Sequence, residues 1–230
     1  INECDERKNT RHVNFLLRTA NYLSDHTVFI ASWLIKLNVW RRKSDYSTIL
    51  NGADKNIFYP KIKKNDVNKK PLNIVTHHWG PNKMKGFDIY KYLDDLTLTP
   101  LWKNRIKFTY IGNIPRDFKF RNTKLIPPKS ADELASCIRE NDIYLTASVN
   151  EPGGMHHIEG ACCGLPLLYR NSGSLPEYCN GYGVKFDNIG NFEEKLEDML
   201  SNYEKFKNKM TDYSNTSDKR ISEWVNLFEA

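Results

Sequence analysis

The stretch from residue 141 to residue 177 constrains the fold more than any other part of the chain. It begins with a short apolar run of strand length, Ile143 to Ala147, and continues into a loop with two adjacent glycines. A helical window, Met155 to Cys163, ends at Gly164 in the position of a C-cap, and a second apolar strand runs from Leu165 to Tyr169. The order strand, glycine turn, helix, strand is the unit that builds a parallel sheet, so we expect an α/β fold.

Two carboxylates bracket the glycine turn. Glu151 lies before the glycines, and Glu159 lies inside the predicted helix. Glycines let a backbone approach a ligand closely, and the free N–H groups near Gly153, Gly154 and Met155, at a helix N-terminus, favour an anion. A carboxylate about one turn into such a helix can accept hydrogen bonds from sugar hydroxyls. Diphosphate and ribose together indicate a nucleotide. For an isolated pair of glycines, a tight turn with solvated carboxylates is the commoner interpretation.

The pattern extends well beyond the glycine pair. The residues that match in order are Glu151, Pro152, Gly154, Glu159, Gly164, Leu165, Pro166, Gly173, Pro176 and Glu177. In this order they resemble the group 1 retaining glycosyltransferases of the GT-B fold, a superfamily with glycogen synthase-like and mannosyltransferase-like members. The resemblance covers most of the chain from about residue 46 onward and concerns mainly the C-terminal, donor-binding domain. It implies a GT-B-type, Rossmann-like parallel sheet with flanking helices, preceded by the tail end of an N-terminal α/β domain.

A domain boundary is predicted near residue 60. The first 50 residues predict helix, strand, helix, strand, with the second helix running from Ser32 to about Arg42, which suits the final part of a nucleotide-binding domain. Near the other end of the chain, a charged amphipathic helix is predicted over residues 191–210. Asn51-Gly52-Ala53-Asp54 with Phe58-Tyr59-Pro60 resembles the signature that ends the N-terminal domain of this family. The expected divisions are a remnant of the N-terminal, acceptor-side domain at 1–60, a linker at 61–71, the nucleotide-sugar-binding domain at 72–212, and a terminal helix at 213–230 that packs back on the N-terminal segment.

A turn-rich segment, His77 to Gly86, follows the first predicted strand of the second domain. Basic side chains at the carboxyl end of a parallel strand face the crevice where α/β folds bind ligands. The resemblance implies an Arg and a Lys on the donor diphosphate here, the Lys directly before a Gly, and Lys85 matches. The Arg is replaced by a His-Trp-Gly that begins at His78, and Lys83 is the candidate for the second charge. A solvated loop lysine is the alternative for Lys85.

The loop after a short predicted strand, Lys124 to Ile126, has a role through the resemblance alone. In the family this loop touches the nucleobase, largely through backbone atoms, which singles out Ile126 to Lys129 and implies donor contacts at Ile126 and Pro127. An ordinary proline-containing turn explains the loop equally well. Ser130 and Glu133 behind it predict a helix that starts with a capping box.

The resemblance implies transfer of a hexose or related sugar, with retention, from a UDP- or GDP-sugar to an unknown acceptor. Glu159 would hold the ribose, while the N–H groups near Gly154 and Met155 would hold the diphosphate together with Lys85. Glu151 is the candidate catalytic residue, placed against the hydroxyls of the transferred sugar rather than acting as a nucleophile. The scheme needs no metal and no cofactor, and the sequence contains no Asp-x-Asp motif.

Other classes of protein fit parts of the sequence. The chain could be a nucleotide-sugar-binding module without turnover, or a GT-B-fold epimerase acting on a nucleotide sugar. His157-Ile158-Glu159 echoes the His-x-Glu of nucleobase deaminases, but the Pro-Cys-x-x-Cys that would complete that zinc site is absent. Either His156 or His157, not both, can face a ligand from a helix turn, and the other is expected to pack.

Composition bounds the partners and the compartment. The 34 basic and 28 acidic residues give a net charge of +6 that is spread thinly, and no nucleic-acid-binding motif accompanies it. Five cysteines, an odd number without a disulfide spacing, favour a reducing compartment and a cytoplasmic protein. No apolar run approaches the roughly 20 residues of a membrane span, although peripheral membrane contact stays open because many relatives act on lipid-linked acceptors. Since the first residue is Ile1, we expect a piece of a longer protein.

Overall fold

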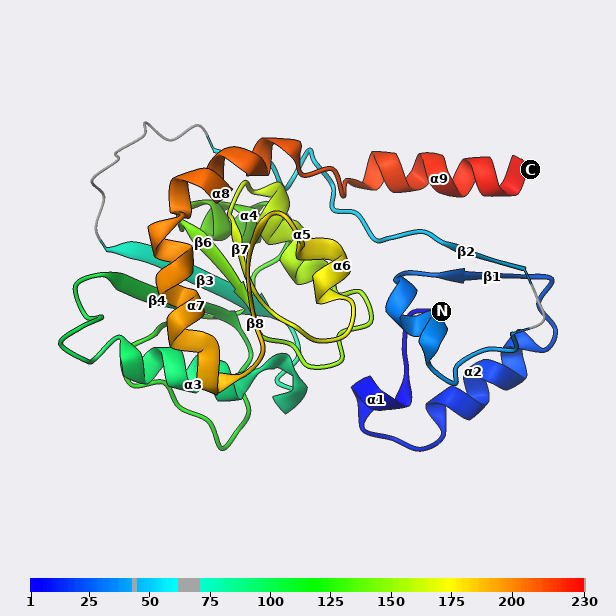
Figure 1. The fold of residues 1–230 in the computed structure, drawn as a ribbon, viewed down its shortest axis with the longest axis horizontal. Helices are drawn as coiled ribbons and strands as arrows, with labels where there is room; N and C mark the ends of the chain where they lie inside the picture. The colour runs from blue at the N-terminus through cyan, green and yellow to red at the C-terminus, as the bar shows by residue number, and fades with distance from the viewer. Residues whose placement is uncertain (43–44, 62–70, 230) are drawn as a thin grey trace.

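A six-stranded parallel sheet forms the larger part of the molecule (Figure 1). The computed structural model describes residues 1–42, 45–61 and 71–229. The strand order is β5-β4-β3-β6-β7-β8, and every neighbouring pair runs parallel. The strands are β3 (Leu72–His78), β4 (Ile106–Gly112), β5 (Lys124–Ile126), β6 (Ile143–Thr146), β7 (Leu167–Arg170) and β8 (Gly183–Phe186). The predicted α/β class with a parallel sheet is confirmed.

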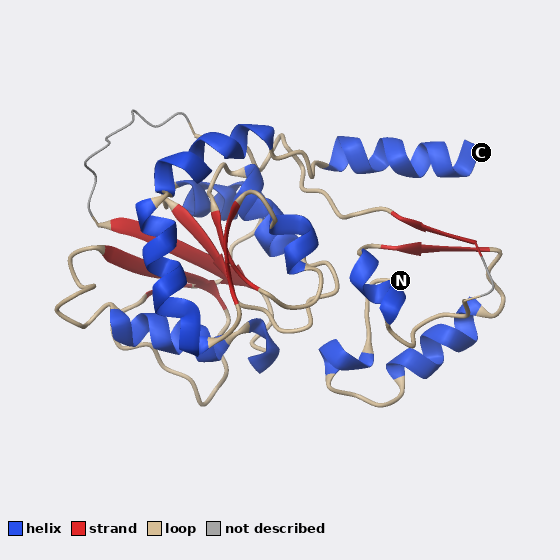
Figure 2. Cartoon of the chain, viewed as in Figure 1, coloured by secondary structure: helices blue, strands red, loops and turns tan. Residues whose placement is uncertain are grey.

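Helices cover both faces of this sheet (Figure 2). One face carries α3 (Phe87–Leu96) and α7 (Ile189–Ser201). The other carries α4 (Ala131–Arg139), α5 (Met155–Cys162) and α6 (Leu175–Cys179). The remaining elements of this part are the 3₁₀ turns η2 (Lys83–Lys85) and η3 (Met210–Asp212) and the helix α8 (Tyr203–Lys209).

Side chains that point alternately to the two faces of the sheet produce two cores. Ile74 and Leu168 pack with α3 and α7, whereas their neighbours Val75 and Leu167 pack with α4, α5 and α6. Successive side chains of a strand point to opposite faces, so a sheet covered on both sides needs apolar residues at consecutive positions. The fully buried runs of β6 and β7 follow from this requirement.

The N-terminal residues form a smaller unit with its own core. Its elements are α1 (Asp5–Lys8), α2 (Val13–Asn21), β1 (His26–Phe29), the 3₁₀ helix η1 (Ser32–Lys36) and β2 (Asp45–Thr48). β1 and β2 pair in parallel. The buried side chains of this core are Cys4, Phe29, Leu34, Val39 and Trp40. All five cysteines of the chain are free thiols.

Hydrogen bonds from α6 join the two units. The Tyr178 hydroxyl donates to the carbonyl of Ile30 at 2.6 Å and accepts the N–H of Asn51 at 2.8 Å. The carboxylate of Glu177 accepts the backbone N–H of Ser32 at 2.8 Å and its hydroxyl at 2.9 Å. The smaller unit is therefore held against the end of the sheet domain where α6 begins.

Two predicted helices are shorter than the sequence pattern suggests. The helix expected from Ser32 to about Arg42 is only the 3₁₀ turn η1, because Leu37 is extended and sends Trp40 back against the ring of Phe29, 5.2 Å between centroids. The helix expected over residues 191–210 is two helices, α7 and α8, separated at Asn202. In both places tertiary packing overrides a helical pattern.

The predicted capping box at the start of α4 does not form. Ser130 makes no side-chain cap hydrogen bond, and Ala131 lies in the left-handed region with φ +45°. That backbone turn takes the Ser130 hydroxyl away from the N–H groups it would accept. Glu133 instead pairs with the ammonium group of Lys129 at 3.4 Å.

The terminal helix α9 (Ser217–Glu229) is tied to the rest of the chain at its start. The backbone of Ala53 exchanges hydrogen bonds with residues 215 and 217, and Lys55 pairs with Asp218. The helix then runs past β2 (Figure 1) and leaves Phe228 80% exposed. Its packing on the N-terminal segment stays a prediction, and of the predicted linker, residues 62–70 lie outside the described residues. No helix within the described ranges is both long and apolar enough to cross a membrane.

Candidate functional site

The candidate site lies at the carboxyl end of the sheet between β3 and β6. The chain leaves β3 toward β4 on one side, while β6 lies on the other, so the connections diverge at this point. Such a switch point leaves a crevice where α/β proteins bind ligands. Here it is bordered by the segment from His77 to Lys85 and by the loop from Glu151 to Met155.

Two adjoining cavities occupy the crevice. The first, which we term the glycine-loop cavity, has a volume of about 480 Å³ and is lined by Arg7, Lys85, Glu151 and residues 153–155, among others. The second, the histidine cavity, has a volume of about 300 Å³ and is lined by His77, His78, His156 and Glu159, among others. Both cavities are lined by Lys85, Gly154 and Met155, so the start of α5 lies between them.

Glu151 is buried between two cations. Its Oε2 lies 3.0 Å from Nη2 of Arg7 and 3.4 Å from Nζ of Lys85. Burial acts to raise the pKa of Glu151, but the charges of Lys85 and Arg7 oppose it, and the pKa is lowered overall. The carboxylate is therefore ionised at neutral pH and serves as a hydrogen-bond acceptor rather than as an acid.

Gly173 allows the chain after β7 to pass over the Glu151 loop. It has φ +59°, and a Cβ there would come within 2.5 Å of the backbone nitrogen of Glu151. The N–H of Ser174 then donates to the carbonyl of Glu151 at 2.8 Å. The Gly-x-x-Pro-Glu motif thus supports the loop that carries the candidate catalytic carboxylate.

Glu159 faces the histidine cavity and is held by His77. Nε2 of His77 lies 2.7 Å from Oε2 of Glu159. The Tyr144 hydroxyl accepts the backbone N–H of His77, and lies 3.0 Å from Nδ1 of the same ring. Because a carboxylate accepts hydrogen bonds, Nε2 of His77 is the donor to Glu159, and Nδ1 lies where it can accept the Tyr144 O–H. One oxygen of the carboxylate is thus oriented by His77.

Lys85 lies between the two carboxylates, on a turn that a glycine makes possible. The ammonium group is partly buried, and burial is the main reason that its pKa is lowered, against the opposing charge of Glu151. Gly86 follows with φ +96°, and a Cβ there would lie 2.3 Å from the carbonyl oxygen of Ala147. Only glycine permits this close approach of the η2 turn to the end of β6.

The remaining histidines of the site are buried and uncharged. Nε2 of His78 is 2.7 Å from the Tyr90 hydroxyl, and Nε2 of His156 is 2.8 Å from the Thr146 hydroxyl. Burial lowers the pKa of both rings well below 6.5. His78 therefore borders the cavity as a neutral group and does not replace an arginine as a cation. His156 lines the cavity, while His157 packs on the ring of Tyr178.

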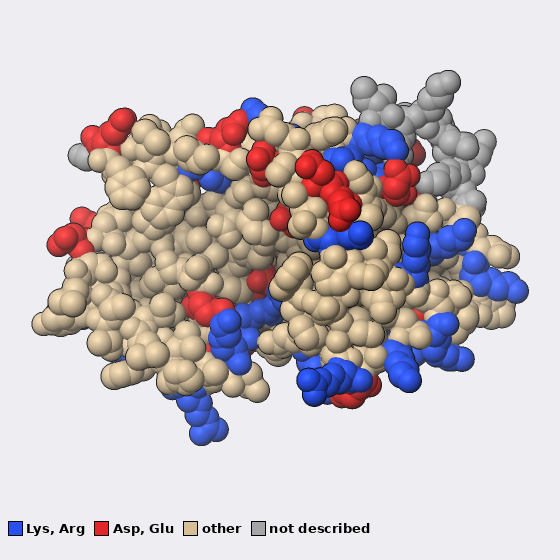
Figure 3. All heavy atoms as spheres, turned by 180° about the vertical axis from the view of Figure 1, so that it is seen from behind, with Lys and Arg blue, Asp and Glu red and all other residues tan. Residues whose placement is uncertain are grey.

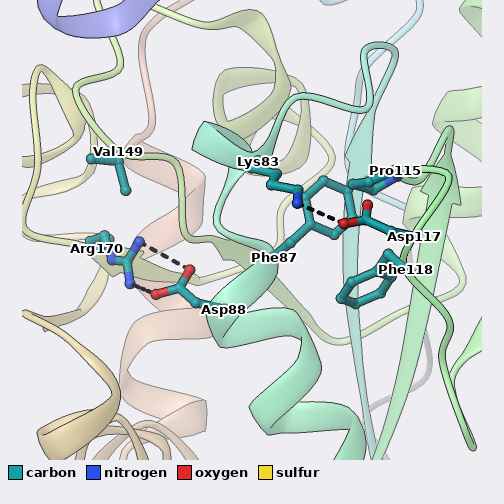
Figure 4. A pocket seen from close by; sticks show the side chains of 8 residues that line it. All are labelled: Lys83, Phe87, Asp88, Pro115, Asp117, Phe118, Val149 and Arg170. Atoms are coloured by element: carbon teal, nitrogen blue, oxygen red, sulfur yellow. Dashed lines mark hydrogen bonds and ion pairs between the residues drawn. The ribbon is translucent and has the colours of Figure 1, made fainter. Parts of the chain in front are cut away.

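Lys83 does not join the other predicted donor-binding residues. Its Nζ lies 2.7 Å from Asp117, and the side chain is 74% exposed. It lines a separate cavity of about 430 Å³ with Phe87, Phe118 and the Asp88–Arg170 ion pair (Figure 4). The 3₁₀ turn η2 separates the two lysines, because Lys83 and Lys85 start and end it.

Part of the predicted nucleobase loop lines the histidine cavity. Ile126 is half-buried against the core beneath α4 and α5, and Pro127 is exposed. Pro128 and Lys129, the next two residues, line the histidine cavity opposite Glu159. Contact of Ile126 and Pro127 with a nucleobase through their backbone atoms stays a prediction.

Two residues of the site had no signal in the sequence. Arg7 belongs to a short charged segment of a kind that is usually exposed to solvent. His77 is one of two adjacent histidines, and the sequence does not distinguish between them. Only the tertiary contacts to Glu151 and Glu159 distinguish them. From behind the molecule, basic and acidic side chains meet in the hollow between the two units (Figure 3). Within the described ranges, no group of three or more His, Cys, Asp or Glu side chains could hold a metal ion.

The chain resembles glycosyltransferases in sequence as well as in fold. Residues 120–217 match the family model for glycosyl transferases group 1. An uncharacterized glycosyltransferase of Methanocaldococcus jannaschii is 24% identical over 209 residues, which are 86% of this chain and 56% of that protein. A probable sucrose-phosphate synthase of Thermosipho melanesiensis is 31% identical over 196 residues, 77% of this chain and 46% of that protein. The chain thus spans about half the length of these curated relatives.

Solved structures share the fold over nearly the whole chain. The sucrose-phosphate synthase of Thermosynechococcus elongatus superposes with a TM-score of 0.73 at 11% identity, over 99% of this chain and 63% of that one. HepE of Anabaena, in complex with UDP and glucose, superposes with a TM-score of 0.72 at 13% identity, over 100% of this chain and 70% of that one. The family match, the two curated relatives and this shared fold together support a group 1 glycosyltransferase.

Proposed function

We propose that the chain is the donor-binding part of a retaining glycosyltransferase that moves a sugar from a nucleoside-diphosphate sugar to an acceptor. The observation that carries the proposal is the meeting of Glu151, Glu159 and Lys85 around the first turn of α5. Two adjoining cavities on either side of that turn provide room for a nucleoside and a sugar, with the diphosphate between them.

Each of these residues has a role in the proposed complex. In the histidine cavity, Glu159 accepts hydrogen bonds from the ribose hydroxyls, with His77 orienting its carboxylate. The N–H groups at the start of α5 and the ammonium group of Lys85 bind the diphosphate. Glu151, ionised in the glycine-loop cavity, accepts hydrogen bonds from hydroxyls of the transferred sugar.

Catalysis in this arrangement is mainly electrostatic. As the bond between the sugar and the diphosphate breaks, negative charge develops on the leaving phosphate. Donors fixed beforehand at the start of α5, together with Lys85, stabilise that charge. Because Glu151 is ionised and paired with cations, it cannot protonate the leaving group, and we infer that the leaving diphosphate itself takes the acceptor proton on the same face. Transfer with retention follows from that geometry.

The base of the donor is proposed to be uracil or guanine. HepE was solved with UDP and glucose, and the pneumococcal O-GlcNAc transferase GtfA with UDP and GlcNAc, both on this fold. These two structures favour UDP. The acceptor, whether a glycan, a lipid-linked sugar or a protein, would bind on the side of the proposed acceptor domain, of which residues 1–60 are a part.

Thermal unfolding with a panel of nucleotides tests the proposal. The panel holds UDP, GDP, ADP and their sugar conjugates. Glu159→Ala is measured beside the wild type, and Glu194→Ala, an exposed residue of α7, is the matched control. A ligand at 100 times its dissociation constant adds about 2.7 kcal/mol, or about 5–10 °C for a chain of this length. We expect one nucleotide to raise the midpoint of the wild type and of Glu194→Ala only. Flat curves for every nucleotide would contradict the proposal.

A further inference from the structure

The glycine-loop cavity contains a cation that comes from the other unit of the molecule. Arg7, on α1, reaches the loops that carry Lys85 and Glu151. Its Nη1 donates to the carbonyl of Met84 at 2.9 Å and to that of Val149 at 2.7 Å. Its Nη2 lies 3.0 Å from Glu151, and the side chain is only 7% exposed. The two backbone carbonyls hold the guanidinium in place independently of the carboxylate.

The charges that line this cavity sum to an excess of one positive charge. Arg7, Lys8 and Lys85 face two carboxylates, Glu3 and Glu151, and Lys8 and Glu3 already pair with each other at 2.8 Å. Arg7 and Lys85 therefore share a single carboxylate. Buried charges persist where they are paired, and a cavity with two cations for one anion is suited to a further anion.

We propose that Arg7 and Lys85 together hold the diphosphate of the donor, and that Arg7 turns part of its hydrogen bonding from Glu151 to a phosphate oxygen when the donor binds. This inference rests on the proposed function. Lys83, the other candidate for a second cation, is exposed and paired with Asp117 in a separate cavity. A guanidinium binds phosphate with two parallel hydrogen bonds. Because Lys85 remains beside Glu151, the exchange leaves neither Arg7 nor Glu151 without an opposite charge.

The exchange would have two consequences. It frees Glu151 to accept hydrogen bonds from the hydroxyls of the sugar, so that occupancy of the phosphate subsite prepares the sugar subsite. It also makes the donor a bridge between the units, because Arg7 lies on α1 and Lys85 on the sheet domain. Donor binding then draws the smaller unit against the crevice.

Calorimetric titration with UDP and with UMP tests the inference on four proteins: wild type, Arg7→Gln, Arg7→Lys and Arg11→Gln. Arg11 is an exposed arginine near Arg7 in the same segment, which makes it the matched control. Loss of a hydrogen bond to a charged group corresponds to about 10- to 100-fold in affinity. We expect Arg7→Gln to bind UDP more weakly by that factor, while its affinity for UMP changes less. Arg7→Lys should recover part of the affinity for UDP, and Arg11→Gln should bind both nucleotides like the wild type.

The outcomes separate this inference from the proposed function. If the wild type binds UDP and Glu159→Ala does not, while Arg7→Gln binds UDP like the wild type, this inference alone is wrong. Equal losses for UDP and UMP with a lowered thermal midpoint would show a structural role for Arg7 and overturn it too. If Arg7→Gln folds poorly, Arg7→Gln/Glu151→Gln removes both charges of the pair and should still bind UDP weakly. A wild type that binds no nucleoside diphosphate overturns both.

Discussion

At the scale of single residues, the site separates groups that stay charged from groups that stay neutral. Glu151, Arg7 and Lys85 satisfy one another as ions in a buried place. Three histidines behind them, His78, His156 and His157, are buried, and burial lowers the pKa of each ring. Burial of neutral imidazoles lowers the stability of the folded state little at neutral pH, but in acid the buried rings resist protonation and the folded state loses stability.

His157 should make the folded state sensitive to acid. Burial lowers the pKa of His157 to about 4, against 6.5 when exposed. Between these two values the unfolded chain binds the proton and the folded chain does not, so stability falls as the pH is lowered from about 6.5 to about 4. For His157 alone the loss is about 3 kcal/mol. Urea denaturation of His157→Gln over this pH range should show a shallower decline than the wild type.

The exposed His12 offers a control for that measurement. His12→Gln is expected to keep the steep acid branch, because the His12 side chain is exposed to solvent in the folded chain as well. If His157→Gln loses stability toward pH 4 as steeply as the wild type, the ring of His157 is not the group that binds the proton on unfolding.

At the scale of elements, α5 sets the position of Glu159. Gly160 follows it and faces the ring of Tyr144 on β6, where a Cβ would lie 2.2 Å from the ring carbon Cδ2. Tyr144 is fully buried and also holds His77. The ring therefore has little room to yield. The close approach of helix and strand brings Glu159 and His77 within hydrogen-bond distance.

Gly160→Ala should therefore destabilise the protein although alanine favours a helix. The gain in helix propensity is about 1 kcal/mol, whereas overpacking costs about 1–3 kcal/mol and moves the helix. We expect a lower free energy of unfolding in a urea titration, and weaker nucleotide binding because Glu159 moves. Gly80→Ala, with no atom near the added Cβ, should leave both unchanged. An unchanged stability in Gly160→Ala would show that α5 can shift without strain.

At the scale of the whole molecule, Tyr178 connects the smaller unit to the sheet domain. Its hydroxyl donates to the carbonyl of Ile30 and accepts the N–H of Asn51. The Asn51 side chain in turn donates to the carbonyl of Gly153 in the glycine loop. The junction thus continues into the site. If the units separated, the ion pair between Arg7 and Glu151 would be broken.

Tyr178→Phe should loosen this junction. Two backbone groups lose their partner, at a cost of about 1–3 kcal/mol, and residues 1–50 should be cleaved faster in limited proteolysis while residues 71–212 remain intact. Tyr182→Phe is the matched control, since the Tyr182 hydroxyl donates to the carbonyl of Asp212 in η3, within the sheet domain. Equal cleavage rates in the two variants would show that other contacts hold the units together.

The sequence by itself determined the class of fold and the identity of the central residues. The order of apolar runs and glycines between Ile143 and Tyr169 predicted parallel strands around α5, and that prediction is confirmed. The prediction was possible because the spacing of apolar residues that distinguishes a strand from a helix is a local property of the chain. The expectation that Glu151, Glu159 and Lys85 belong to one site came from a motif, and in the structure they line adjoining cavities.

Only the tertiary structure decided the partners of these residues. Arg7 is 144 residues from Glu151, and no periodicity connects them, whereas Lys83 lies next to the site in sequence and faces a different cavity. The length of η1 and the failed cap at Ser130 were likewise decided by packing and by one left-handed residue. Local patterns specify what each element is, but which side chains meet at a crevice depends on how distant elements are brought together.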